Sequence, residues 1–157
     1  FPYTTLFRSG LRGKTLVYST TNGTQAFEQV RDRGEVVFGA FVNLSALAAY
    51  LLSRKCPVVI LCSGWKGRFN LEDTVFAGAL TARLCQNEEF YPGSDAAHAA
   101  VDLWHSASPD LMDYHQKAEH RERLRRLGLD DILEYTFTLD LCPVVPRATQ
   151  GVIRLIT

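Results

Sequence analysis

The stretch "TLVYSTTNGTQAF", residues 15–27, decides the fold expected for this chain. Its first four residues have the composition of a buried strand, and a helix is expected from about Thr24 to Arg33, where Gly34 ends it. Between strand and helix lie six small residues, five of which are polar. The stretch therefore predicts a strand, a polar turn and a helix in succession.

The same succession occurs twice more along the chain. Residues 35–40, "EVVFGA", are expected to form a second strand, and Asn43 is expected to cap the helix after it. Residues 57–62, "PVVILC", form a continuous apolar run that is typical of a strand covered on both faces, which would bury the Cys62 thiol. This order predicts an α/β fold with a mostly parallel sheet, right-handed crossovers and flanking helices.

The chain after the third expected strand is predicted to be mainly helical. Helices are expected at residues 71–86, after the capping residue Ser94, and at residues 109–127. An extended tail is expected from "YTFTLD", residues 135–140, to the end of the chain.

The two ends of the chain differ in character. The opening "FPYTTLFRS", residues 1–9, resembles a translated sequencing-adapter oligonucleotide, so residues 1–10 are expected to be a non-native or disordered tail. Residues 11–157 are expected to form a single α/β domain, the C-terminal portion of a longer parent.

Composition excludes several classes of partner. Of the 157 residues, 46% are hydrophobic and 22% are charged, which suits a soluble globular protein. The formal net charge is zero and no apolar run is long enough to cross a bilayer, so neither nucleic acid nor a membrane is expected as a partner. The four cysteines lie far apart without a CxxC pair, which favours a cytoplasmic protein without a zinc site. The composition does not decide whether the protein forms a homo-oligomer.

The turn between the first strand and its helix has two interpretations. The hydroxyl and amide groups of "TTNGT", with backbone N–H groups at a helix start, could hold a phosphate. The alternative is that Asn22 and Gly23 make a turn and Thr24 caps the helix. The spacing excludes a P-loop.

The third strand is followed by charged residues that could complete a phosphate site. Glu72 and Asp73 fall at a helix start, where Asp73 is the better candidate to hold Mg²⁺, although carboxylates at a helix start are also explained by the helix dipole. Lys66 and Arg68 could neutralise a phosphate, or could be solvated loop cations. Because the carboxyl ends of parallel strands meet at one edge, these residues are expected to face "TTNGT".

The ordered segments "STTNGTQAF", "GAFVNLSALAAYL", "VVILCSGWKGRFNLEDTVFAGAL", "SDAAHAA" and "DDILEYTFTLDLCPVVP" resemble the 2-phosphosulfolactate phosphatases of coenzyme M biosynthesis. The resemblance covers nearly all of residues 11–147. It implies a Mg²⁺-dependent phosphatase that hydrolyses 2-phosphosulfolactate, a small anionic substrate, to sulfolactate and phosphate. A non-catalytic anion-binding or interaction module of the same fold is the alternative.

The resemblance also implies site residues. At the matching positions, the expected catalytic residues are Asp73, Thr21 and His120, and the expected Mg²⁺ ligands are Asp73 and Glu72. The expected substrate-binding residues are Thr20, Asn22, Gly23, Thr24 and Asn43. Lys66 is added to them because its charge could neutralise a phosphate. The Ser and Gly that the family has beside its histidine are absent around His120. The family also has acidic and arginine-bearing N-terminal motifs that this chain lacks, so a fragment without them could be inactive.

Overall fold

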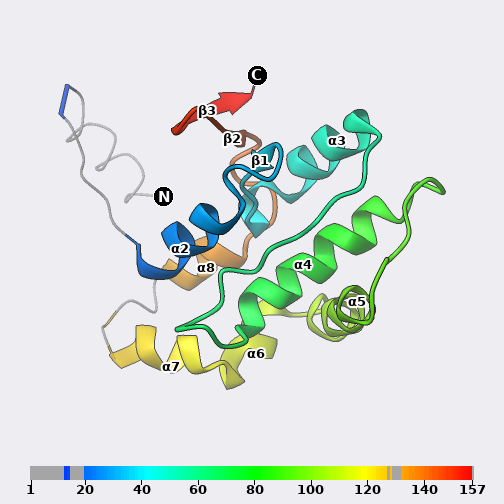
Figure 1. The fold of residues 1–157 in the computed structure, drawn as a ribbon. Helices are drawn as coiled ribbons and strands as arrows, with labels where there is room; N and C mark the ends of the chain where they lie inside the picture. Colours follow the sequence, from blue (N-terminus) through cyan, green and yellow to red (C-terminus); the bar gives the residue numbers. More distant parts are fainter. Residues whose placement is uncertain (1–12, 15–19, 127, 129–131, 157) are drawn as a thin grey trace.

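The computed structural model describes residues 13–14, 20–126, 128 and 132–156. The elements within this part of the chain follow in the order α2 (Thr21–Val30), β1 (Val36–Val37), η1 (Phe41–Asn43), α3 (Leu44–Arg54), α4 (Leu71–Leu84), α5 (Asp95–Ala107), α6 (Leu111–Tyr114), η2 (His115–Lys117), α7 (Glu119–Arg126), α8 (Ile132–Phe137), β2 (Val145–Thr149) and β3 (Val152–Ile156). A small sheet and α3 lie at one end of the molecule, and α6 and α7 lie at the other (Figure 1).

The sheet is antiparallel, so the predicted parallel sheet is wrong. Its three strands lie in the order β1-β2-β3, and Val36 of β1 lies opposite Ala148 of β2. The strands β2 and β3 are joined by Gln150 and Gly151, whose φ angles of 51° and 76° suit a tight two-residue hairpin turn. The strand that pairs with β1 is therefore β2 of this hairpin, which runs antiparallel to it, and not one of the predicted parallel strands.

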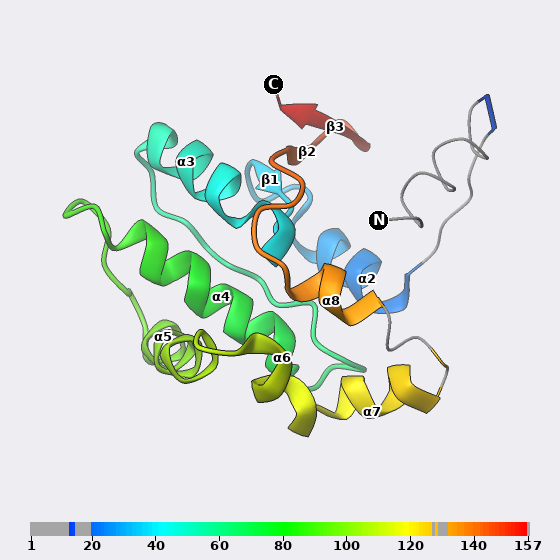
Figure 2. The same ribbon diagram turned by 180° about the vertical axis from the view of Figure 1, so that it is seen from behind.

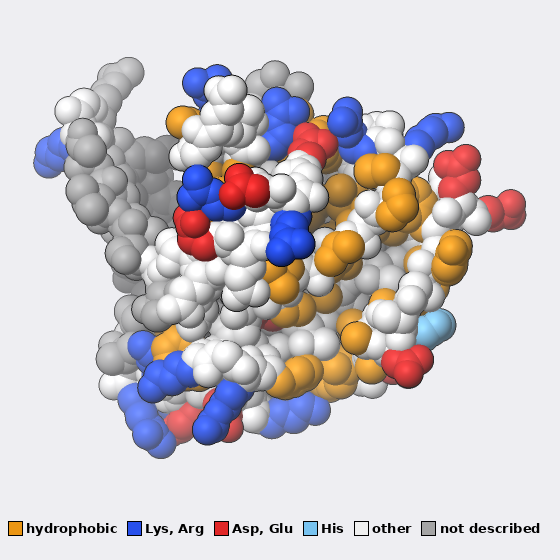
Figure 3. Space-filling view, viewed as in Figure 1, with side chains coloured by type: hydrophobic (Ala, Val, Ile, Leu, Met, Phe, Trp, Pro, Cys, Tyr) orange, Lys and Arg blue, Asp and Glu red, His pale blue; other side chains and the backbone are white. Residues whose placement is uncertain are grey.

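The apolar run at residues 57–62 is not part of a strand, which corrects a second prediction. Within the described part of the chain it makes no strand pairing, and the side chains of Val59 and Leu61 are 91% and 46% exposed. Cys62 is likewise exposed rather than buried. The first predicted strand, residues 15–18, lies outside the described residues, and β1 is paired with β2. No described strand therefore covers the run. Hydrophobic side chains are exposed on the face of the molecule that Figure 3 shows.

The helices agree better with the sequence, with three differences. The helices expected at 71–86 and after Ser94 are confirmed as α4 and α5. The charged helix expected at 109–127 is divided into α6, η2 and α7, because Ala118 has extended backbone. Of the segment expected to open the extended tail, residues 135–140, the first half is instead the end of α8. The first helix begins three residues before the predicted start, because Thr20 caps it.

The core lies where α3, α4 and α8 meet. Phe41 is 2% exposed and packs its ring against those of Phe76 and Phe137. The view from behind shows α5 nearly end-on, next to α4 (Figure 2). This packing is close because α4 has Gly78 at the contact, where an added Cβ would lie 1.9 Å from the Ala100 carbonyl oxygen of α5. No helix among the described residues is both long and apolar enough to cross a membrane.

Candidate active site

The centre of the candidate site is a tight turn at residues 64–68, between the apolar run and α4. The N–H and the carbonyl of Trp65 bond the carbonyl and the N–H of Arg68, at 3.0 and 2.9 Å. Three residues of the turn have left-handed backbone: Gly64, Lys66 and Gly67, with φ of 68°, 51° and 72°. This compact backbone presents two N–H groups to other segments of the chain.

The 64–68 turn joins the two segments that the sequence predicts to meet. The N–H of Gly64 donates to Oδ2 of Asp73 at 2.7 Å, and the N–H of Lys66 donates to Oδ1 of Asn22 at 3.2 Å. The polar start of α2 and the acidic start of α4 are therefore neighbours. They meet through this turn and not at the edge of a parallel sheet.

The start of α2 is stabilised by its own hydroxyl groups. Oγ1 of Thr20 accepts from the N–H of Gly23 at 3.1 Å, and the hydroxyl of Thr24 donates to the carbonyl of Thr20. Thr20, and not the predicted Thr24, is thus the helix cap. The Gly23 N–H that was expected to face a phosphate is engaged by that cap. The side chain of Thr21 lies outside the described residues, and the phosphate cradle stays a prediction.

Glu72 and Asp73 lie in the first turn of α4, as predicted. Asn70 caps this helix, with Oδ1 accepting from the N–H of Glu72 at 2.9 Å. Partial burial, followed by the charge of Asp73, raises the pKa of Glu72 to about 6. No described Lys, Arg or His lies within ion-pair distance of the Glu72 carboxylate. A carboxylate whose charge is disfavoured by burial and by a neighbouring carboxylate suits a cation.

This pair fits Mg²⁺ in number and kind. Magnesium is usually held by one or two carboxylates, with water and phosphate oxygens completing its shell. The described residues contain no group of three or more His, Cys, Asp or Glu that could enclose a metal. Glu72 and Asp73 as Mg²⁺ ligands, with substrate and water completing the shell, stay a prediction.

A groove of about 1170 Å³ lies beside this pair. Its polar end includes Thr20 and Gly23 of the α2 start, together with Ser63, Glu72 and Asp73. Its other walls are mainly apolar and include the run at residues 57–62. The groove gives the polar start of α2 and the acidic start of α4 a shared opening.

Asn43 is not brought to this groove. It is 5% exposed, and its amide donates to the carbonyls of Phe38 and Val144 at 3.2 and 2.9 Å. Its Oδ1 accepts from the N–H of Ala40 at 2.8 Å. The prediction that the Asn43 side chain caps α3 is wrong, because it makes no capping hydrogen bond to this helix. Both of its amide hydrogens thus stabilise the fold, and its predicted contact with the substrate stays a prediction.

The remaining predicted residues are placed only in part. Lys66 is exposed, and its ammonium lies 5.8 Å from the centre of the Trp65 ring. His120 lies in α7, and its side chain is outside the described residues. Its predicted catalytic role is not tested.

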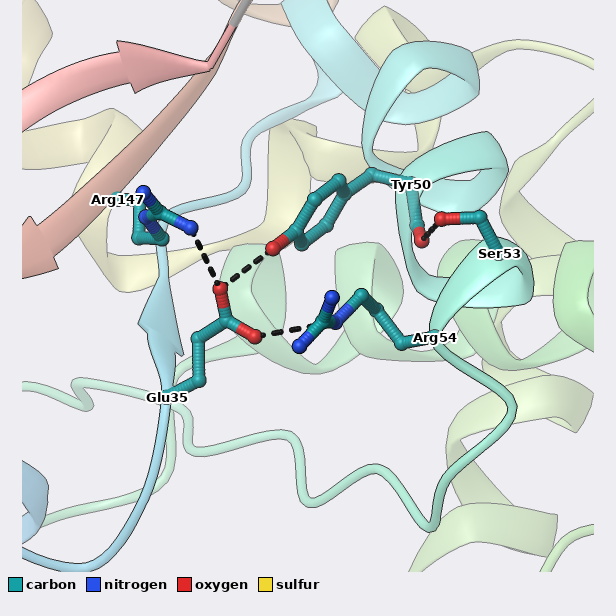
Figure 4. Close-up of polar contacts among 5 residues, drawn as sticks. All are labelled: Glu35, Tyr50, Ser53, Arg54 and Arg147. Carbon is teal, nitrogen blue, oxygen red and sulfur yellow. Dashed lines mark hydrogen bonds and ion pairs between the residues drawn. The ribbon is translucent and has the colours of Figure 1, made fainter.

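A polar cluster at the edge of the groove was not predicted from the sequence. Glu35 accepts from the hydroxyl of Tyr50 and forms ion pairs with Arg54 and Arg147, both at 3.3 Å (Figure 4). The Tyr50 hydrogen bond, with help from both arginines, lowers the pKa of Glu35. The cluster ties the start of β1 to α3 and β2. No local pattern signals it, because Arg147 lies 112 residues from Glu35.

Comparison with known proteins agrees with the resemblance. The profile of the 2-phosphosulpholactate phosphatase family matches residues 3–151. The chain belongs to this family. Three relatives named probable 2-phosphosulfolactate phosphatase come from Thermotoga maritima, Caldanaerobacter subterraneus and Gloeobacter violaceus. They are 38%, 32% and 40% identical over 90%, 92% and 88% of this chain.

The family resemblance is thus confirmed, with a difference in length. The chain spans 60%, 59% and 57% of the lengths of those three family members. The 64–68 turn, Asn22 and Asp73 all lie inside the part that the family profile matches.

Proposed function

We propose that this protein takes part in Mg²⁺-dependent hydrolysis of 2-phosphosulfolactate to sulfolactate and phosphate. Family membership supports the proposed reaction, and one structural observation supports the proposed position of the site. The 64–68 turn holds both Asn22 of α2 and Asp73 of α4 through backbone N–H groups. The two carboxylates of α4 and the polar start of α2 therefore face one groove.

Each residue has a role that follows from its position. Asp73 and Glu72 would hold Mg²⁺, which when bound neutralises charge on the phosphate oxygens. The Gly64 N–H fixes the orientation of the Asp73 carboxylate. The Lys66 N–H fixes Asn22 of the α2 start, and the exposed Lys66 ammonium adds a positive charge to the same turn, which would attract the anionic substrate. Water adds to phosphorus, the phosphorus–oxygen ester bond breaks, and the alcohol of sulfolactate leaves with a proton.

The test is Asp73→Asn in the full-length gene product, with phosphate release from 2-phosphosulfolactate as the readout. The variant keeps the size of the side chain and removes its charge, so activity should fall about 100-fold or more. Asp102→Asn, which makes the same change on an exposed face of α5, is the control and should keep full activity. Equal activity of the two variants would reject Asp73 as a metal ligand.

The alternative is a non-catalytic module that binds anions. Such a module would need only hydrogen-bond donors and positive charge, such as the exposed Lys66 in the turn that holds Asn22, and no metal site. Thermal unfolding with phosphate or sulfolactate, with and without Mg²⁺, separates the two functions. Stabilisation by the anion that is independent of Mg²⁺, without turnover, would favour the module.

A further inference from the structure

A second cleft lies between the 64–68 turn and α7. It measures about 780 Å³ and is lined by Trp65 and Lys66 of the turn and by residues 116–119, 122, 123 and 126 of the opposite wall. Of the residues predicted for the active site, Lys66 lines it and the Mg²⁺ ligands do not.

The cleft carries an excess of positive charge. Four cations and two carboxylates line it, which leaves a net charge of +2. One of the carboxylates, Glu122, is already paired with Arg125 and Arg126. Among the described residues, Lys66, Lys117 and Arg123 have no carboxylate within 4.0 Å. Within the described part of the chain, these three charges are therefore left for an anionic ligand.

Aromatic rings hold two of these cations in place. The guanidinium of Arg123 lies 4.1 Å from the centre of the Trp65 ring, and the ammonium of Lys117 lies 3.7 Å from the centre of the Tyr114 ring. A ring face attracts a cation without taking up its N–H groups, whereas a carboxylate would accept them. The N–H groups of Arg123 and Lys117 can therefore still donate hydrogen bonds to a ligand.

The cleft is joined to the candidate active site by a single turn. Lys66 lines the cleft with its side chain, while its N–H bonds Asn22 and the N–H of Gly64 bonds Asp73. A molecule with one anionic group near Asp73 and another in the cleft would be held across this turn.

We propose that the cleft is the subsite for the sulfonate group of the substrate, with Arg123, Lys117 and Lys66 as its binding residues. This rests on the function proposed above. A phosphate that is to be hydrolysed needs the carboxylates and their cation, whereas a sulfonate is a permanent monoanion that needs only hydrogen-bond donors and positive charge. The cleft offers these without a metal site.

The experiment compares two substrates in the full-length protein: 2-phosphosulfolactate, and 2-phospholactate, which lacks the sulfonate. The measured quantity is the ratio of their kcat/KM values. Arg123→Gln should lower this preference about tenfold, mainly through KM for the sulfonate substrate, as expected for the loss of a charge-assisted hydrogen bond. Arg125→Gln, which removes the same charge from α7 outside the cleft, should leave the preference unchanged.

Equal preference in wild type, Arg123→Gln and Arg125→Gln would overturn the proposal. If circular dichroism shows that Arg123→Gln does not fold, Lys117→Gln is measured in its place, with the same expected loss of preference. If the wild type hydrolyses neither substrate, the proposed function fails, and calorimetric binding of sulfolactate then tests the subsite separately. Binding that Arg123→Gln weakens and Arg125→Gln does not would support it, and no binding to the wild type would overturn it.

Discussion

The N–H of Gly64 donates to the carboxylate of Asp73 over 2.7 Å, across nine residues of sequence. This bond fixes the acidic start of α4 against the turn that also holds Asn22. The same turn borders the cationic cleft beside α7. Its backbone geometry therefore controls both the proposed cation site and the proposed sulfonate subsite.

Gly64→Ala should impair catalysis more than folding. Gly64 has a φ of 68°, and an added Cβ would lie 2.6 Å from the carbonyl oxygen of Arg68, so the turn must shift. The Asp73 carboxylate would then lose the hydrogen bond from the Gly64 N–H. We expect phosphatase activity to fall about tenfold or more, at a cost of about 1–2 kcal/mol in the free energy of unfolding.

Gly67→Ala is the matched control for this prediction. Gly67 has a similar φ of 72°, but an added Cβ meets no atom within 4 Å. The variant should pay a similar backbone strain and keep most of its activity. If both variants lose activity equally, general strain in the turn, and not the Gly64–Asp73 bond, is responsible.

Local signals predicted part of this site correctly. The helix start at Leu71 is visible in the sequence because Asn70 precedes two acidic residues and an apolar run. The meeting of Asn22 and Asp73 was also expected, although for a wrong reason. A parallel sheet would have brought them together at its edge, whereas the structure does so through the left-handed backbone of the 64–68 turn.

The rest depends on partners that lie far away in the sequence. The apolar run at residues 57–62 has the composition of a buried strand, but burial requires neighbouring strands, and their positions are not encoded in its periodicity. Similarly, Asn43 has the right type and place for a helix cap, yet its Oδ1 accepts from the Ala40 N–H, and the first turn of α3 is capped by Asp140, about 100 residues later. The cationic cleft was missed because Trp65 and Lys66 lie far in the sequence from the residues of the opposite wall, 116–126.

Gly78→Ala should destabilise the packing of α4 on α5. In an isolated helix the change would be favourable by up to about 1 kcal/mol. Here the new methyl would lie 1.9 Å from the Ala100 carbonyl oxygen and 3.0 Å from Cβ of Trp104, so α5 must move away. We expect a net loss of about 2 kcal/mol or more in the free energy of unfolding by urea.

Gly93→Ala provides the comparison for Gly78. An added Cβ there meets nothing within 4 Å, and Gly93 is exposed. Its free energy of unfolding should stay within about 0.5 kcal/mol of the wild type. Wild-type stability of the Gly78 variant would mean that the two helices are less closely packed than described.

The stability of the fold should decrease when the pH falls below about 6.5, through His115. His115 is 1% exposed and its ring stacks on Phe137 at 4.4 Å, so burial lowers its pKa. The Leu111 carbonyl, bonded to Nδ1, opposes this shift, and the charges of Lys117 and Arg121 add to it. Between the two pKa values the unfolded chain binds more protons, so acid favours unfolding.

The measurement is the free energy of unfolding of wild type and His115→Phe at pH 7, 6 and 5. The wild type should lose up to about 1.4 kcal/mol per pH unit relative to the variant. His98→Gln, a change at an exposed histidine of α5, should follow the wild type. Parallel pH curves for wild type and His115→Phe would show that His115 titrates normally.

Asp140→Ala should weaken α3, although the two lie 95 residues apart. The Asp140 carboxylate accepts from the N–H of Ser45 at 2.7 Å and from its hydroxyl at 2.6 Å, and so serves as the cap that Asn43 does not provide. Ser45 Oγ in turn accepts from Arg83 of α4 at 2.7 Å. Removal of the carboxylate leaves the Ser45 N–H without this partner, so we expect a loss of about 2 kcal/mol in the free energy of unfolding.

Asp140→Asn tests whether charge or geometry matters in this cap. Asn tolerates the φ of 59° at this position and keeps one oxygen acceptor for the Ser45 N–H, so it should lose about half as much stability as Asp140→Ala. Asp102→Ala, on the exposed side of α5, should unfold like the wild type in the same urea titration. If Asp140→Ala also unfolds like the wild type, the first turn of α3 is held by its packing alone, because Leu44 and Leu47 are buried in the core beside it.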